Sequence, residues 1–490
     1  MAERPAPPSR EQAGTRALKN VGVRAFAELV GKLATLVLFG VMARELGEAR
    51  FGIFIFALAY LGIVITPVGL GMDPYLLRVV AADRARAPWH FLNIVALKLV
   101  VGIPVVLLSL LALWPLGYGP LERATVALLS VSVLLEIVGR SFHALFNAVE
   151  RGELLAVCVI AQRVATAGLG IAVLAAGGGL LAVAAVFAFG SALQVVLATI
   201  LVHRFVPLAR APLGPAAWRA ITRRSFPFAA QDVFTVLLFR LDTVLLSLIA
   251  TEAAVGRYGA AYRLLDATLF ISWSLNGAFA AMYVYLGRDT EPTLGGVYGR
   301  SLKFGLILLV PIAVTLGILA EPICVAFFGQ EFRSAAPALR LLAPVVVLLG
   351  LVTLSTTMIV SRRPPGVVAR MTAVMVVVNI ALNVALIPPY EDRGAALAML
   401  ATELPLAAIV LILAHRAAGG VDWARTAVAP VVAGAVMAAP MVVLSALPVV
   451  ALVAGAVTYM AALIALERRF SPGDLELLGQ VIKRRLGMRR

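Results

Sequence analysis

The chain has 490 residues, of which 61% are apolar and 14% charged, and its mean hydropathy is +0.97. A soluble globular protein carries roughly 45–50% apolar and 25% charged residues, so this composition excludes a soluble domain, a disordered chain and collagen. The net charge of +16 does not require a nucleic-acid partner. Cytoplasmic loops of membrane proteins are rich in Lys and Arg and face anionic lipid, which explains the basic excess. The sequence predicts an all-α integral membrane protein embedded in a lipid bilayer.

Apolar runs of the length that crosses a bilayer, about 20 residues, recur along the chain. Residues 1–18 contain no such run, so we expect a flexible cytoplasmic tail there and not a cleaved signal peptide. The predicted transmembrane helices, about 14 in number, cover 19–42, 52–77, 91–114, 123–146, 154–176, 180–202, 226–250, 257–286, 303–320, 336–360, 367–387, 395–414, 428–446 and 449–466.

The positive charges lie mainly on one side of the predicted membrane. With alternating spans, 29 of the 42 Lys and Arg lie in the two tails and the loops on their side, and 8 lie in the opposite loops. Because cytoplasmic loops retain positive charge, both termini are predicted to be cytoplasmic. The basic segment 467–490 has apolar residues at helical spacing, which predicts an amphipathic helix on the inner leaflet; a disordered basic tail is the alternative.

A short internal repeat predicts two similar halves. Arg50-Phe51-Gly52 opens the second span and Arg257-Tyr258-Gly259 opens the eighth. An even number of spans separates them, so the halves run the same way through the membrane, as in transporters built from parallel repeats. We expect a six-helix lobe at 19–203, a cytoplasmic linker at 204–225, a second six-helix lobe at 226–416 and two additional helices at 417–466.

Ionisable residues inside the spans are the candidate functional residues. Arg24, Glu28 and Lys32 follow one another at i, i+4 and i+8, so they share one face of the first helix with alternating sign. Such residues are costly in the membrane and usually face an interior or a wet cavity. Structural ion pairs or snorkelling end residues are the alternative, especially for charges near span ends such as Asp73 and Arg140.

We expect these charges and their counterparts in the seventh and eighth spans to line a central cleft. The substrate-binding candidates are Arg24, Glu28, Lys32, Arg240, Asp242, Arg263, Asp266 and Asn276. The candidates for coupling to an ion are Glu28, Asp232 and Asp242. Mixed charge with prominent cations suits an anionic or zwitterionic head group.

No catalytic or metal-binding pattern competes with this interpretation. The four His are scattered without metal-ligand spacing, and no GxxxxGK[ST] phosphate loop is present. Cys158 and Cys324 lie in or beside apolar runs, so neither a disulfide framework nor a zinc site is indicated. We expect a transporter without cofactor or metal, and not an enzyme.

Four stretches of the sequence share one further property. They are Asn20-Val21 with Arg24, Glu28, Lys32, Ala43-Arg44-Glu45-Leu46-Gly47 and Phe51-Gly52; Val255-Gly256-Arg257-Tyr258-Gly259; Gly329-Gln330-Glu331-Phe332 with Ala335-Ala336 and Leu339; and Asn379, Asn383, Ile387-Pro388 with Gly394-Ala395-Ala396. Each of them resembles a segment of bacterial polysaccharide flippases of the O-antigen and capsule type, within the multidrug/oligosaccharidyl-lipid/polysaccharide exporter superfamily. The resemblance implies a V-shaped pair of lobes in the bacterial inner membrane. It also implies alternating access for an undecaprenyl-diphosphate-linked oligosaccharide, and a polymerase and glycosyltransferases as pathway partners.

Two other functions stay open at this stage. A drug or cation antiporter of the same fold would favour a net acidic cavity, which the Arg and Lys residues of the spans oppose. A scaffold that recruits glycan-assembly enzymes without transport predicts that neutralising the buried charges leaves the surface glycan normal. No short motif in the sequence specifies which glycan or which coupling ion is used.

Overall fold

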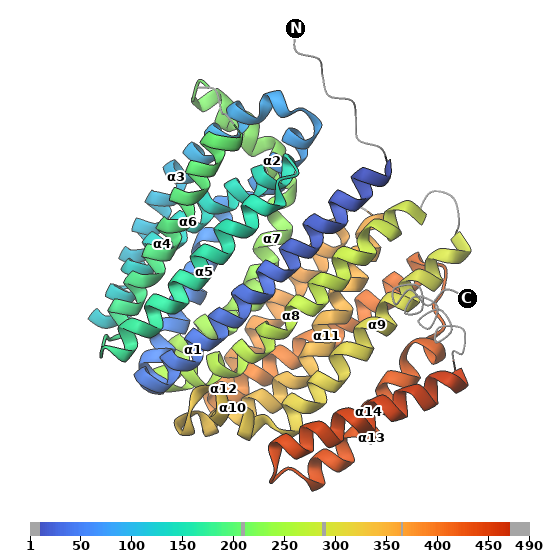
Figure 1. Ribbon diagram of the computed structural model, residues 1–490. Helices are drawn as coiled ribbons and strands as arrows, with labels where there is room; N and C mark the ends of the chain where they lie inside the picture. The colour runs from blue at the N-terminus through green and yellow to red at the C-terminus, as the bar shows by residue number, and fades with distance from the viewer. Residues whose placement is uncertain (1–9, 207–210, 287–290, 364–365, 471–490) are drawn as a thin grey trace. The chain divides into compact units, whose positions relative to one another are not determined.

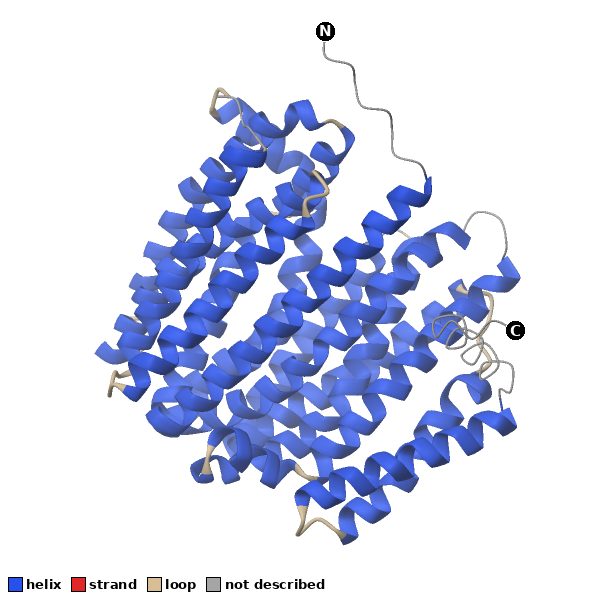
Figure 2. Ribbon diagram, in the orientation of Figure 1, coloured by secondary structure: helices blue, strands red, loops and turns tan. Residues whose placement is uncertain are grey.

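The computed structural model describes residues 10–206, 211–286, 291–363 and 366–470. Within these ranges the regular elements are all helices, and short loops join them (Figure 2). The prediction of an all-α fold is confirmed. Most of the predicted C-terminal amphipathic segment, residues 471–490, lies outside the described residues.

The elements follow one another along the chain with few irregular connections (Figure 1). They are α1 Arg10–Gly69, α2 Met72–Ala82, the 3-10 helix η1 Arg84–Arg86, α3 Ala87–Ala112, α4 Pro120–Ala148, α5 Gly152–Ala175, α6 Leu180–Phe205, α7 Pro215–Ile249, α8 Glu252–Leu286, α9 Glu291–Ile318, α10 Ala320–Phe328, the 3-10 helix η2 Gln330–Ala335, α11 Ala336–Arg362, α12 Gly366–Ala417, the π-helix η3 Ala424–Val428, α13 Ala429–Val443 and α14 Pro448–Phe470.

Two of these elements each contain two consecutive helices. The backbone of α1 turns at Gly47, where φ is 74°, and that of α12 turns at Glu391, where φ is 46°. Nine segments of the described chain are long and apolar enough to cross a membrane, and they include both of these double helices. With the long helices α4, α7 and α8, the described residues supply fourteen helices of spanning length, in agreement with the sequence.

Large apolar side chains cover the outside of the molecule. Leu108 and Val449 are 65% and 75% exposed, and each belongs to a helix that is long and apolar enough to cross a membrane. A water-soluble surface would not present such side chains, whereas a bilayer needs them. We therefore expect these exposed apolar side chains to face lipid.

The described residues up to Gly256 form one compact unit. In this first unit α1 packs against α4, α5 and α7, and α6 packs against α4 and α5. Its main core joins α2, α3, α4 and α5 through buried side chains that include Leu76, Phe91, Phe146 and the free thiol of Cys158. This core fixes the position of the short helix α2, which is central to the site.

The described residues from Arg257 onward form a second compact unit. Its core joins α11 to α9 and α12, and the last two helices, α13 and α14, pack on α9. A buried ion pair connects Lys303 of α9 to Glu467 of α14, with 2.6 Å between Nζ and Oε2. The hydroxyl of Tyr459 also donates a hydrogen bond to the carbonyl oxygen of Ile307, at 2.9 Å.

The division into two units differs from the predicted lobe boundary. The sequence placed the boundary in a linker at 204–225, whereas the structure divides at Gly256, so α7 belongs to the first unit. The reason is that α7 packs on α1, α2 and α3. The parallel repeat of two six-helix lobes stays a prediction.

Gly52 of α1 and Gly256 of α8 meet at a reciprocal close approach. A Cβ on Gly52 would collide with the carbonyl oxygen of Glu252, and a Cβ on Gly256 would collide with the carbonyl oxygen of Glu48. The pattern Glu-x-x-x-Gly thus occurs on both helices, and each glycine faces the other helix's Glu. Only glycine permits backbones to approach this closely.

Candidate functional site

Three of the predicted site residues lie on described helices, but their side chains are outside the described part of the structure. Arg24 and Glu28 belong to α1, and Asp232 belongs to α7. Their assignment to a substrate or coupling site therefore stays a prediction.

Lys32, Arg240 and Asp242 lie in the first unit. Lys32 and Arg240 are half-buried and Asp242 is buried, with 1% of its surface exposed. The side-chain stem of Arg240 packs on α1, because its Cγ lies 3.9 Å from the position of a Cβ on Gly62. These charges are thus held between helices and do not face lipid in isolation.

The α8 candidates lie in the second unit. Arg263 and Asp266 form an ion pair, with 3.8 Å between Nη1 and Oδ2, and their side chains are 14% and 31% exposed. The buried carbonyl oxygen of the Asn276 side chain accepts no hydrogen bond from any described residue. The structure therefore brings Arg263 and Asp266 together, as their i, i+3 spacing predicts.

A helix break in the first unit creates a polar pocket that the sequence did not predict. The sequence predicts one continuous span over 52–77, but α1 ends at Gly69 and α2 begins at Met72. Between them Leu70 and Gly71 adopt left-handed backbone conformations, with φ of 44° and 64°. The break leaves the first peptide N–H groups of α2 without helical partners at its start.

Lys98 of α3 lies beside this break and is fully buried. Its ammonium donates hydrogen bonds to Asp73 Oδ1 at 2.6 Å, Ser141 Oγ at 2.8 Å and the carbonyl oxygen of Ile137 at 3.1 Å. Ser141 also donates to Asp73 Oδ1, at 3.1 Å. All three hydrogens of the ammonium are used, which permits a charge to stay buried at this position.

The cavity in front of Lys98 has a volume of about 280 Å³, and we call it the inner pocket. It is lined by Ile65, Thr66, Gly69, Gly71, Met72, Asp73, Pro74, Lys98, Ile137, Arg140, Thr235 and Val236, from α1, α2, α3, α4 and α7. Two cations, one carboxylate and two hydroxyls line it, and an anionic group that enters would take over contacts that Lys98 and Arg140 make with Asp73 and Glu136.

Arg140 connects the inner pocket to a polar layer within the first unit. Its guanidinium pairs with Glu136 one turn earlier on α4, with 3.0 Å between Nη2 and Oε1. Next to them, His143 Nε2 lies 2.7 Å from the side-chain nitrogen of Gln194 on α6. Arg163 of α5 lies against α1, since a Cβ on Gly31 would collide with its side chain. Polar side chains therefore join α1, α4, α5 and α6 inside the bundle.

The sequence contained a signal for the inner pocket that span prediction passes over. Two glycines flank Leu70, and Asp73-Pro74 follows at once, a combination that starts helices and interrupts a continuous span. Asp73, Lys98 and Arg140 were each visible as charges inside spans. Their convergence was not, because they lie 25 and 42 residues apart along the chain.

Among the described residues, no group of three His, Cys, Asp or Glu side chains is placed to hold a metal ion. In the first unit Lys98 pairs with Asp73, and the more exposed Arg140 pairs with Glu136. Asp73, Lys98 and Arg140 all line the inner pocket.

The bundle of long apolar helices with a charged internal pocket defines the chain as a polytopic membrane protein. The chain belongs to the family of polysaccharide biosynthesis proteins, whose family model matches residues 17–283.

Relatives and solved structures agree with this assignment. A protein of the archaeon Haloferax volcanii, described as the probable low-salt glycan biosynthesis flippase Agl15, is 24% identical over 375 residues, which are 76% of this chain and 77% of that protein. The fold is similar to that of lipid II flippase MurJ in an inward closed conformation, with a TM-score of 0.73 at 12% identity, over 91% of this chain and 99% of that chain. An inward-facing multidrug resistance MATE transporter of the MOP superfamily matches with a TM-score of 0.64 at 13% identity, over 81% and 98% of the two chains.

Proposed function

We propose that the chain flips an undecaprenyl-diphosphate-linked oligosaccharide from the cytoplasmic to the outer leaflet by alternating access, driven by an ion gradient or the membrane potential. Membership of the polysaccharide biosynthesis family supports a glycan substrate. The names of the archaeal relative and of the MurJ structure, both flippases, support a lipid-linked one. We place the chain in the cytoplasmic membrane, with both termini cytoplasmic.

The inner pocket is the observation that carries this proposal. A diphosphate that crosses the membrane interior needs cations that are already inside the bundle, because a bare charge there is costly. Lys98 and Arg140 supply two such cations, and Thr66 and Thr235 supply hydroxyls suited to sugar or phosphate oxygens. Asp73 holds Lys98 in place while the pocket is empty. When substrate enters, its oxygens replace part of the contact between the Lys98 ammonium and the Asp73 carboxylate.

Arg24 and Arg240 are proposed to hold the diphosphate along the same route. Glu28 would balance Arg24 and Lys32 before substrate arrives, and the acids Asp232 and Asp242 are the proposed coupling groups. Arginine suits this role because its planar guanidinium forms two parallel hydrogen bonds to phosphate and keeps its charge when desolvated.

Transport by purified protein in proteoliposomes is the test. A fluorescent undecaprenyl-diphosphate-linked oligosaccharide is placed in the vesicles, and its exposure to an external quencher is followed over time. We expect movement above that of empty vesicles, loss of movement in Arg24→Ala and Arg240→Ala, and partial activity in Arg240→Lys. The control is Arg151→Ala, because Arg151 is 46% exposed and its contacts, an ion pair with Glu153 and a position over the Phe205 ring, do not line the inner pocket.

Three outcomes would overturn the proposal. Absence of movement with correctly folded wild-type protein would exclude a flippase. Normal movement in both alanine variants would exclude their role in binding the diphosphate. Extrusion of organic cations by the same vesicles, without movement of the glycolipid, would favour a drug antiporter, and one of the solved structures of similar fold is a multidrug resistance transporter.

A further inference from the structure

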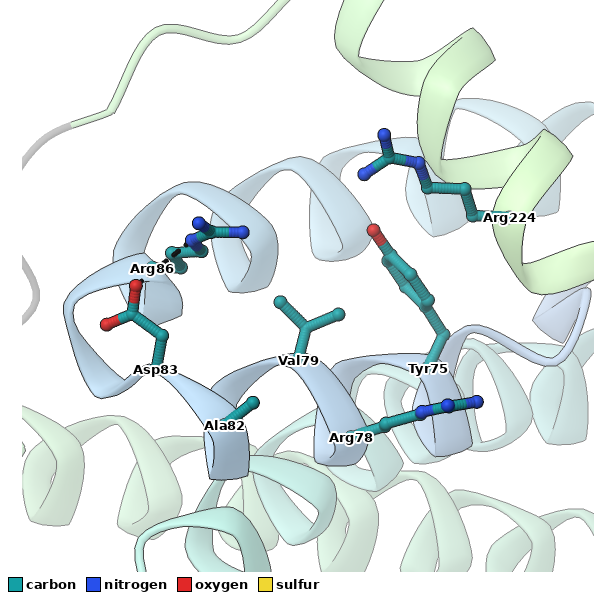
Figure 3. Close-up of a pocket in the computed structure, with 7 residues that line it drawn as sticks. All are labelled: Tyr75, Arg78, Val79, Ala82, Asp83, Arg86 and Arg224. Carbon is teal, nitrogen blue, oxygen red and sulfur yellow. Dashed lines mark hydrogen bonds and ion pairs between the residues drawn. The ribbon is translucent and has the colours of Figure 1, made fainter.

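A second pocket in the first unit is rich in arginine and is not part of the inner pocket. It is lined by Tyr75, Arg78, Val79, Ala82, Asp83, Arg86 and Arg224, and its volume is about 520 Å³ (Figure 3). We call it the arginine pocket. Arg86 and Arg224 extend from opposite sides toward the space above Val79, and the Tyr75 hydroxyl points to the same space (Figure 3). The pocket thus presents three guanidinium groups and one carboxylate.

The single carboxylate is already engaged. Asp83 Oδ2 accepts a hydrogen bond from Arg86 Nε at 3.0 Å, and Asp83 Oδ1 accepts one from the backbone N–H of Ala85 at 3.1 Å. Arg78 and Arg224 form no salt bridge with any other residue of the described chain. The pocket therefore keeps at least two positive charges that form no ion pair with a carboxylate of the described residues, which suits a polyanion.

The walls of the arginine pocket are rigid. Tyr75 is 6% exposed, and its ring lies 5.8 Å from the ring of His90. His90 Nδ1 in turn lies 3.0 Å from the carbonyl oxygen of Arg86, which ties the tyrosine wall to the start of α3. Figure 3 shows Arg86 and Arg224 on facing sides of the same small space. Like charges held together without a carboxylate between them are stabilised by an anion.

The arginine pocket lies at the boundary between apolar span and polar loop. It opens where η1 joins α3, whose apolar segment begins at Arg84. Trp89 and Trp218 pack against the core next to it. Tryptophan is enriched at the level of lipid head groups, so this boundary coincides with the head-group region of a bilayer. The anion most available there is a phosphate attached to a lipid.

We propose that the arginine pocket binds the phosphate or diphosphate group of a membrane lipid, and that this is where the lipid-linked substrate is first held before it reaches the inner pocket. That the transported substrate is held here first rests on the proposed function, whereas binding of a lipid phosphate does not. The binding groups are the guanidiniums of Arg78, Arg86 and Arg224, with the Tyr75 hydroxyl as an additional donor.

The two pockets lie along the same pair of helices. Arg224 and Thr235 are eleven residues apart on α7, which places them on one face with about 16 Å between them along the axis. On α2, Asp73 and Pro74 line the inner pocket, and the following turns from Tyr75 line the arginine pocket. A head group released from the arginine pocket therefore meets the inner pocket along α2 and α7.

Binding by the purified full-length protein in detergent tests the proposal. Geranylgeranyl diphosphate is titrated into labelled protein, and affinity is measured by microscale thermophoresis. We expect the double variant R78Q/R224Q to bind at least about tenfold more weakly, because each lost guanidinium removes hydrogen bonds to a charged group. The matched control is R84Q/R223Q, which removes two neighbouring arginines that do not line the pocket. It should bind within about twofold of wild type.

Competition distinguishes the source of the phosphate. Displacement by dioctanoyl-phosphatidylglycerol at similar concentration would assign the site to anionic lipids in general, whereas weak displacement would assign it to a lipid diphosphate such as the substrate. Equal binding by wild type and R78Q/R224Q, or equal loss in R84Q/R223Q, would overturn the proposal. Failure of wild-type transport with intact Arg-dependent binding would refute the flippase function alone, because the binding assay requires no transport.

Discussion

The ion pair between Lys303 and Glu467 gives a quantitative prediction about the attachment of α14. The two side chains are 7% and 6% exposed, so both charges lie almost entirely within protein. Only Oε2 of Glu467 is bonded, since its buried Oε1 accepts no hydrogen bond from any described residue. Replacement of Lys303 by Met would leave a carboxylate buried without its cation. Breaking a buried pair from one side costs about 3–5 kcal/mol.

The double variant Lys303→Met, Glu467→Met separates this penalty from loss of packing. Replacing a whole buried pair by apolar residues of similar volume is often neutral or stabilising, so we expect the double variant to recover most of the loss. The control is Arg333→Met in the surface pair with Glu321, whose side chains are 64% and 43% exposed. An exposed pair contributes about 0–1 kcal/mol.

The free energy of unfolding of each variant is measured by SDS titration in mixed micelles, with tryptophan fluorescence as the readout. The expected order of stability is wild type, Arg333→Met and the double variant close together, with Lys303→Met well below them. A loss in Lys303→Met no larger than in Arg333→Met would refute the reasoning. A double variant as unstable as Lys303→Met would refute it too, because the defect would then be packing and not an unpaired charge.

Three further predictions follow from the structure. Gly256→Ala should destabilise the protein by at least about 1–3 kcal/mol in the same unfolding assay, because its Cβ meets the carbonyl oxygen of Glu48. Arg257→Ala should lower the free energy of unfolding by about 3–5 kcal/mol, because the side chain of Asp392, which is 6% exposed, loses the guanidinium that lies 2.9 Å away. Arg257→Lys should recover part of that loss. A cysteine introduced at the exposed Ala216 should react with an impermeant thiol reagent only from the cytoplasmic side of oriented vesicles; labelling from the other side would reverse the predicted topology.

The sequence predicted the elements of the fold better than their partners. Span number and helical class follow from local composition, because about 20 apolar residues are needed to cross the membrane wherever they occur. The family motif at Arg257 was visible in the sequence, but its partners Glu391 and Asp392 lie more than 130 residues away. The same holds for Lys303 and Glu467. Which buried charge meets which is decided by helix packing, and one chain alone carries no local signal for it.

In the candidate site, too, local contacts follow from the sequence, whereas contacts between distant helices do not. Arg263 and Asp266, two candidates from the sequence, form an ion pair because a helix fixes the distance between positions three apart. The inner pocket and the arginine pocket depend on the position of α2, which the helix break at Leu70 and Gly71 separates from α1. Hydropathy cannot detect a break that leaves the segment equally apolar on both sides.

The reciprocal approach of Gly52 and Gly256 has an energetic consequence for the contact between the two helices. The nearest atoms to each glycine's Cβ position belong to the opposite backbone, so the helices touch here through peptide atoms, each glycine against the carbonyl oxygen of Glu252 or Glu48. Contacts between Cα hydrogens and carbonyl oxygens contribute only about 0.5–1 kcal/mol each. The two glycines themselves have no side chain that would change rotamer if the backbones separated at this point. A contact of this kind fixes the spacing of the two helices by steric exclusion, with only a small enthalpic attraction of its own.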